Sequence, residues 1–136
     1  MTRDAITIPT YSTPGPHVSH AVRVPPGRGL VFLTGITARG QGDQLVGVGD
    51  IDAQVRHVFG VIRDMLTAAG SSMEDIVTVT TYVTEVDHLP RAVEIRREFF
   101  RPPMPATTGI IVKALRDPRM LVEITVVAMM SEQPVR

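Results

Sequence analysis

The segment spanning residues 120–130 constrains the fold more than any other part of the chain, because it is apolar on both faces of a strand. Successive side chains of a strand point to opposite faces of the sheet. A strand of this kind belongs in a sheet that is buried on both sides. The rest of the molecule must therefore supply cover for two faces. One face carries Met120, Val122, Ile124 and Val126, and the other carries Leu121, Val127 and Met129.

Two segments have the pattern of amphipathic helices. In residues 51–69, apolar side chains recur along one helical face, and Gly70 follows where a left-handed stop is favourable. Residues 89–100 are predicted to form a second helix, with Pro90 in the tolerated first turn and prolines 102 and 103 after its end. Two helices suffice for one face of such a sheet, so we expect further copies of the chain to bury the other face.

The remaining regular segments have the composition of strands. Residues 19–24 and 30–33 flank the turn-forming residues 25–29, which predicts a β-hairpin. Residues 76–84 alternate β-branched side chains, and residues 109–115 precede the final strand. The resulting order is ββ-α-β-α-ββ. It predicts a single α+β domain over residues 1–136, in which two helices pack on one face of a mixed sheet.

Charge and composition argue against several classes of function. Lys and Arg number 14 and Asp and Glu also number 14, so the net charge is zero. A zero balance argues against nucleic acid and against a polybasic membrane-surface protein. The chain has no cysteine, and hence no disulfide, thiolate nucleophile or cysteine-ligated metal. Neither a signal-peptide core nor an apolar run of membrane-spanning length is evident, so we expect a soluble cytoplasmic domain.

Glu123 is the most informative charged residue, since it lies in the middle of the apolar segment 120–130. A carboxylate buried there without a partner would be costly. One interpretation is a carboxylate that handles a proton, with its pKa raised by apolar surroundings. The other is an ordinary position on a half-solvated strand, or an ion pair with Lys113 or an arginine. The spacing of the residues leaves both interpretations open.

No metal site is expected. His17 and His20 have a spacing that binds zinc only on a helix, and prolines 14 and 16 exclude a helix immediately upstream. A third ligand is not evident. Glycines 47 and 49 lack the preceding buried strand and the third glycine of a dinucleotide-binding loop, so this segment is predicted to be a flexible loop.

A series of short motifs resembles the Rid/YjgF family of reactive-intermediate deaminases, over about residues 11–130. The resemblance implies a chorismate-mutase-like α+β fold. It also implies a homotrimer with small-molecule ligand sites in the clefts between subunits, which agrees with the sheet that is apolar on both faces. The motifs are Ser19-His20-Ala21-Val22, Leu33-Thr34-Gly35, Gln54, Ala68-Ala69-Gly70 with Asp75-Ile76-Val77, Phe99-Phe100, Pro103-x-Pro105-Ala106-Thr107 and Val122-Glu123-Ile124.

The resemblance also implies a reaction. Active members of the family hydrolyse enamines and imines, such as 2-aminoacrylate, to 2-keto acids and ammonia without a cofactor. Glu123 matches the family glutamate that positions or activates water, and Thr34 with Gly35 matches a hydrogen-bonding element of the first hairpin. The ligand is expected to contact Thr107, Gly109 and the backbone near Ile110.

Two of these positions depart from the family pattern. Thr107 stands where the family has an arginine that clamps the substrate carboxylate, and Gly109 stands where a cysteine is often found. A threonine cannot form the bidentate, charge-assisted pair of an arginine. Either another cation reaches the cleft, with Arg39, Arg96 and Lys113 as candidates, or the ligand has no carboxylate there.

Two functions follow from this comparison of motifs. The first is a cofactor-free hydrolase that acts on a small imine, enamine or related metabolite in an altered cleft. The second is a non-catalytic homotrimer that binds a small metabolite or has a regulatory role.

Overall fold

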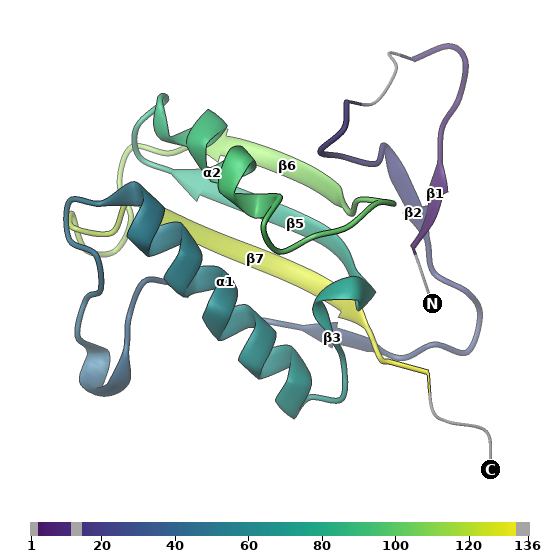
Figure 1. Ribbon diagram of the computed structural model, residues 1–136, viewed down its shortest axis with the longest axis horizontal. Helices are drawn as coiled ribbons and strands as arrows, with labels where there is room; N and C mark the ends of the chain where they lie inside the picture. Colours follow the sequence, from purple (N-terminus) through teal and green to yellow (C-terminus); the bar gives the residue numbers. More distant parts are fainter. Residues whose placement is uncertain (1–2, 12–14, 133–136) are drawn as a thin grey trace.

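The computed structural model describes residues 3–11 and 15–132, and it has two helices packed on one face of a mixed β-sheet (Figure 1). The strands of the main sheet lie in the order β3-β7-β5-β6, and β4 also pairs with β7. Strands β5 and β6 are parallel, whereas the other pairs are antiparallel. The α+β, chorismate-mutase-like fold predicted from the sequence is confirmed. The elements are β1 (Asp4–Ile6), β2 (Ala21–Arg23), β3 (Leu30–Phe32), β4 (Ile36–Thr37), η1 (Gln41–Asp43), α1 (Ile51–Ala68), η2 (Met73–Asp75), β5 (Ile76–Val83), α2 (His88–Arg96), β6 (Ala106–Ile111) and β7 (Val122–Met129).

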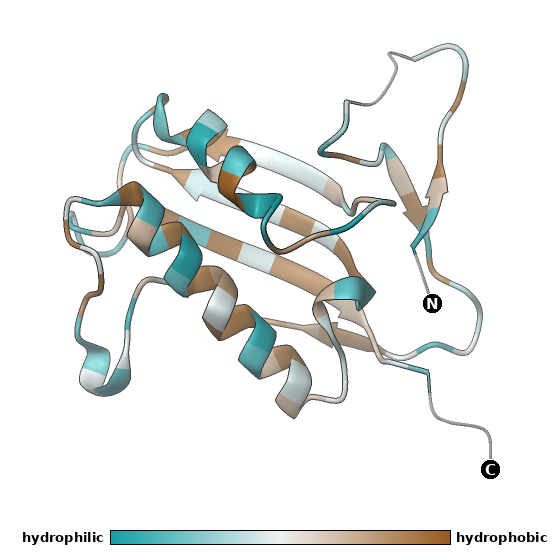
Figure 2. Ribbon diagram, viewed as in Figure 1, coloured by the Kyte–Doolittle hydropathy of each residue, from teal (hydrophilic) through white to brown (hydrophobic). Residues whose placement is uncertain are grey.

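The core lies between the helices and one face of the sheet. Asp50 caps α1 by accepting a hydrogen bond from the Ala53 N–H at 3.1 Å. The helix buries an apolar stripe against alternate residues of β7, as the brown bands in Figure 2 show. Neither helix of the described chain is long and apolar enough to cross a membrane. The buried residues of α1 include Val55, Val58, Phe59, Ile62 and Leu66, and those of β7 include Val122, Ile124, Val126 and Ala128.

Helix α2 ends at Arg96 rather than at the predicted residue 100. The reason is aromatic packing, because Phe99 and Phe100 leave the helix to contact Phe59 of α1. Their ring centroids lie 5.1 Å and 5.7 Å from that of Phe59. Aromatic pairs at these distances stabilise a core beyond their buried area. The packing therefore joins the end of α2 to the middle of α1.

The opposite face of the sheet is only partly apolar, which corrects the prediction from residues 120–130. Glu123 and Thr125 lie on this face of β7, and both are half-buried. Phe32 of β3, which pairs with Val127, is 71% exposed. Both described helices lie on the other side of the sheet (Figure 1). This face is therefore a mixed surface of apolar side chains, hydroxyls and one carboxylate.

The predicted hairpin between residues 19–24 and 30–33 is wrong. Strand β2 pairs with β1, which the sequence did not reveal, and β3 pairs with β7. The connection contains Pro25 and Pro26, which have no N–H to donate to a ladder. The Arg28 N–H still closes a turn on the Pro25 carbonyl oxygen at 3.4 Å. The turn is formed as predicted, but the two strands belong to different sheets.

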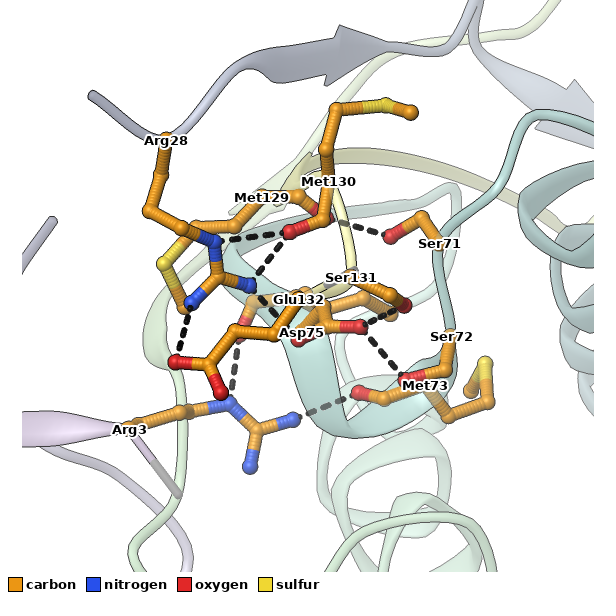
Figure 3. Close-up of polar contacts among 11 residues, drawn as sticks. Arg3, Arg28, Ser71, Ser72, Met73, Asp75, Met129, Met130, Ser131 and Glu132 are labelled. Atoms are coloured by element: carbon orange, nitrogen blue, oxygen red, sulfur yellow. Dashed lines mark hydrogen bonds and ion pairs between the residues drawn. The ribbon is translucent and has the colours of Figure 1, made fainter. Parts of the chain in front are cut away.

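The start of the described chain is anchored by Arg3, which is 4% exposed (Figure 3). Its guanidinium donates hydrogen bonds to the carbonyl oxygens of Ile76, of Met73 at 2.6 Å and of Pro103 at 2.8 Å. Burial lowers the pKa of Arg3 to about 10. One side chain thus joins two segments that are remote in sequence, residues 73–76 and the proline-containing segment at Pro103.

The other end of the described chain is held at Asp75, in the same region (Figure 3). The Asp75 carboxylate accepts hydrogen bonds from Ser72 Oγ at 2.8 Å and from Ser131 Oγ at 2.6 Å. It also pairs with Arg28, whose side chain is mostly buried, at 3.3 Å. The segment after β7 is therefore fixed against η2.

Candidate functional site

The Glu123 carboxylate lies directly over Gly35. A Cβ atom at position 35 would lie 2.2 Å from Glu123 Oε2 and 2.8 Å from its Cδ, so any side chain there would displace the carboxylate. Pairing of β7 with β4 and β5 places Thr37 and Tyr82 beside Glu123. Glycine at position 35 thus allows the Glu123 carboxylate to occupy this place, and its own backbone is not left-handed.

A cavity of about 220 Å³ opens beside this carboxylate. Across the described residues, the Glu123 side chain forms neither a hydrogen bond nor an ion pair, so the predicted pair with Lys113 or an arginine is not formed. Arg39 lines the cavity, and its Nε donates to Thr37 Oγ1 at 3.1 Å. The carboxylate is therefore available to a ligand or water in a space that also contains cations. The lining residues are Thr34, Gly35, Thr37, Arg39, Arg116, Met120 and Glu123.

The loop before β7 is held in place by Gln54, which is 1% exposed. Its Nε2 donates to the carbonyl oxygens of Arg119 at 2.9 Å and of Gly47 at 3.1 Å, and its Oε1 accepts from the Leu121 N–H at 2.8 Å. This loop carries Arg116, a cavity residue that sequence reasoning missed. The buried amide therefore positions one wall of the Glu123 cavity.

The register of the sheet separates the predicted site residues. Ile110 pairs with Tyr82, which pairs with Glu123, so these three side chains share one face. Gly109 pairs with Thr81, which is buried toward the helices, and Thr107 lies two residues earlier on the same strand. Since side chains alternate, Thr107 and Gly109 lie on the helix-covered face. The predicted residues Thr34, Gly35 and Glu123 are brought together, whereas Thr107 and Gly109 are not brought to them within one chain.

A second cavity, of about 280 Å³, lies on the helix-covered face where α2 crosses β6. Thr107 and Gly109 line it from the strand, and Leu89 and Arg96 line it from the helix. A Cβ atom at position 109 would lie 2.8 Å from Leu89 Cδ2, so a side chain there would displace the end of Leu89. The glycine at this position is thus in close contact with α2.

Arg96 is the cation of this second cavity. It is 3% exposed, and its Nη2 donates to the His17 carbonyl oxygen at 3.2 Å. Its Nε is enclosed and, among residues 3–11 and 15–132, has no hydrogen-bond partner. Burial lowers the pKa of Arg96. Of the three candidate cations, Arg39 lines the Glu123 cavity and Arg96 the Thr107 cavity, while Lys113 is exposed beyond the end of β6.

The two N-terminal histidines do not gather into a metal site with other residues. In the described part of the chain, no three His, Asp or Glu side chains lie close enough to share an ion. His20 instead packs edge-on against Tyr11, with ring centroids 4.8 Å apart. His17 lines the second cavity, the one that contains Arg96 and Thr107.

Comparison with known proteins agrees with this architecture. The family model described as Endoribonuclease L-PSP matches residues 11–130. The chain is 31% identical over 99 residues to a 3-aminoacrylate deaminase, RutC, of Acinetobacter baylyi, which covers 73% of this chain and 78% of that protein.

Solved structures are similar as well. A Rid-family protein of unknown function from Yersinia pestis, YyfB, has a TM-score of 0.83 and 30% identity, covering 95% of this chain and 99% of that one. RidA from an Antarctic Psychrobacter has a TM-score of 0.69 and 25% identity, covering 92% of both chains. The resemblance seen in short motifs thus extends over nearly the whole chain.

Proposed function

Because the chain belongs to the Rid/YjgF family, and therefore has a deaminase-like or small-molecule role, we propose that it is a cofactor-free hydrolase of a small imine or enamine. The observation that carries this proposal is the free Glu123 carboxylate seated over Gly35 in a cavity. The net charge of zero does not favour a ribonucleic acid substrate. The activity named for RutC is the precedent for this type of reaction.

In this mechanism Glu123 acts as the general base for a water molecule. The carboxylate accepts a proton from water, and the water oxygen attacks the imine carbon to form a carbinolamine. Glu123 returns that proton to the nitrogen, then takes the proton of the new hydroxyl group and passes it to the nitrogen as well. The C–N bond breaks, ammonia leaves and a keto group remains. An enamine enters the same sequence after it is protonated on carbon. Thr34, beside Glu123, supplies a hydroxyl that can hold the water or the polar group of the ligand.

The proposal places the complete site between two copies of the chain. Thr107 and Gly109 lie on the opposite sheet face from Glu123, so one chain cannot bring them to one ligand. The face that carries Glu123 also exposes Phe32 and Leu30, which a second copy would bury. A closed ring of three copies, in which each contributes both halves once, satisfies this arrangement, and we propose a homotrimer.

Thr107 favours the alternative function, a non-catalytic trimer that binds a small metabolite. The family arginine that would clamp the substrate carboxylate is absent from this position. A protein can lose turnover by such a change while keeping its cavity. Binding without hydrolysis would support this alternative.

The test follows hydrolysis of freshly generated 2-aminoacrylate and of longer imino acids by their ultraviolet absorbance. Wild type should accelerate hydrolysis over buffer, and Glu123→Gln should lose most of that acceleration. Glu85→Gln is the matched control, because Glu85 is an exposed glutamate outside both cavities. If wild type and Glu123→Gln have the same rate as buffer for every substrate, the hydrolase proposal is wrong. Native mass spectrometry of the same samples measures whether the chain is a trimer.

A further inference from the structure

We propose that Arg96 is the carboxylate-binding residue of the cavity under α2, and that its ligand is a small monocarboxylate with a short apolar chain. This inference rests on the proposed function, because the carboxylate is taken to belong to the substrate or its keto-acid product. Helix α2 then supplies the carboxylate-binding arginine that the family pattern has at position 107.

Arg96 is buried without an acidic partner among the described residues. The side chain is 3% exposed, and no carboxylate of the described residues forms an ion pair with it. Its recorded contact is the 3.2 Å hydrogen bond from Nη2 to the His17 carbonyl oxygen. A guanidinium is costly to bury unless its donors are used and its charge is balanced. A bound anion would supply both the acceptor and the charge.

The position of Arg96 relative to Thr107 also favours this role. Arg96 and Thr107 line the same cavity, one from the helix and one from the strand. A guanidinium from α2 thus serves the space into which a longer side chain at position 107 would point. Thr107 is short enough to leave that space open to a ligand.

The lining of the cavity indicates the class of ligand. Leu89 and Val93 form an apolar wall, and Thr81 and Thr107 provide hydroxyls. One arginine with apolar walls suits a singly charged, planar carboxylate better than a phosphate, which carries more charge. The volume of about 280 Å³ is at the lower limit of ordinary ligand pockets, which favours a ligand of few atoms.

Binding requires a small turn of the guanidinium. Nε is enclosed by protein, whereas Nη2 uses only one of its two hydrogens on the His17 carbonyl oxygen. Turning the group toward the cavity presents Nε–H and the second hydrogen of Nη2 side by side. This pair of donors matches the two oxygens of one carboxylate.

The test measures binding of 2-oxobutanoate by calorimetry, with uncharged butan-2-one as the matched ligand without a carboxylate. Wild type should bind the acid and not the ketone. Arg96→Met should weaken binding of the acid by about tenfold or more, the loss expected for a charge-assisted anchor. Arg97→Met is the matched control, since Arg97 is the exposed neighbour in the chain, and it should bind as wild type does.

Two further measurements keep the inference falsifiable if Arg96→Met folds poorly. Adding Thr107→Arg to Arg96→Met should restore binding, because a guanidinium then returns to the cavity from the strand. In wild type, the Arg96 Nε–H signal in a ¹H–¹⁵N spectrum should shift on titration with 2-oxobutanoate and not with butan-2-one. Equal affinity of Arg96→Met and wild type, equal binding of acid and ketone, or an unmoved Nε–H signal would each overturn the inference.

The same experiment separates this inference from the proposed hydrolase. Glu123→Gln should still bind 2-oxobutanoate in a way that depends on Arg96, while losing turnover. If no variant has activity but binding still depends on Arg96, the hydrolase fails and the carboxylate site stands. If hydrolysis proceeds equally in wild type and Arg96→Met, the hydrolase stands and the carboxylate site fails.

Discussion

Mixed trimers test the division of the site between two chains. Glu123 and the Arg96–Thr107 cavity lie on opposite faces of one sheet, so each complete site should take Glu123 from one chain and Arg96 from its neighbour. Glu123→Gln alone and Arg96→Met alone each damage every site of a homotrimer. When the two variants are mixed, some interfaces pair the intact Glu123 of one variant with the intact Arg96 of the other.

The expected recovery follows from counting interfaces. In a ring of three chains drawn at random from equal amounts of both variants, each site has about a one-in-four chance of receiving both intact residues. Specific activity of the unselected mixture should therefore rise from near zero to about a quarter of the wild-type value. Trimers selected for both variants should reach about a third, because every mixed ring of three has one intact site. A site built within one chain would give no recovery at any mixing ratio.

The assay uses variants with different affinity tags, unfolded together in urea, refolded and purified through both tags. Hydrolysis of 2-aminoacrylate is then compared with that of the same variants refolded separately and combined. Glu123→Gln refolded with the double variant is the control that cannot form an intact site. If mass spectrometry shows mixed trimers and the activity does not exceed that of the separate variants, the two-chain site is refuted.

Four other changes have outcomes that the structure specifies. Gly35→Ala should lower kcat by about tenfold or more with little effect on the circular dichroism spectrum, because the new Cβ displaces the Glu123 carboxylate; a wild-type kcat would contradict this. Gln54→Leu leaves the Arg119 carbonyl oxygen and the Leu121 N–H without these partners and removes one of two hydrogen bonds on the Gly47 carbonyl oxygen, so it should lower stability by roughly 2–3 kcal/mol and Tm by about 6–12 °C in a melting experiment. Arg3→Met should lower the free energy of unfolding in urea by about 2–4 kcal/mol, since the buried carbonyl groups lose the hydrogen bonds that the guanidinium donates; an unchanged urea midpoint would show that water replaces those bonds. Hydrogen bonds from the side chain and backbone of Arg119 lower the pKa of Asp117 to about 2, so the stability it contributes should persist from pH 7 to about pH 4 and be lost progressively as pH falls from about 4 to about 2; a carboxyl NMR titration with a midpoint near 4 would contradict this.

The parts of the fold that were predictable are those specified by local pattern. Helix α1 runs from Ile51 to Ala68, one residue short of the expected range, because a long apolar stripe and a capping Asp50 define it. Strand β5 (Ile76–Val83) was predictable from its alternating β-branched side chains. Strand β6 begins at Ala106 rather than at residue 109, since it pairs with Thr78 of β5 and bridges Ser19. These partners are remote in sequence, so no local pattern reveals them.

The site was predicted in part. The pattern of residues predicted Glu123 in an apolar strand, the family resemblance singled out Thr34 with Gly35, and the structure brings all three residues together. Whether Thr107 shares a face with Glu123 depends on the register of three strands, which composition does not encode. The burial of Arg96 was equally hidden, because the charged residues Arg97 and Glu98 follow it and the helix has a weak apolar stripe.

The contact between Gly35 and Glu123 couples the two positions in evolution, because a side chain gained at one would displace the side chain at the other. A Cβ atom at position 35 would lie 2.2 Å from Glu123 Oε2, so the two side chains compete for one place. A lineage that gains a side chain at position 35 should therefore lose or shorten the one at position 123. Among related sequences, glycine at position 35 should therefore accompany glutamate at position 123 more often than either occurs alone. The glycine then serves as a marker, readable without any structure, of which relatives have retained the carboxylate.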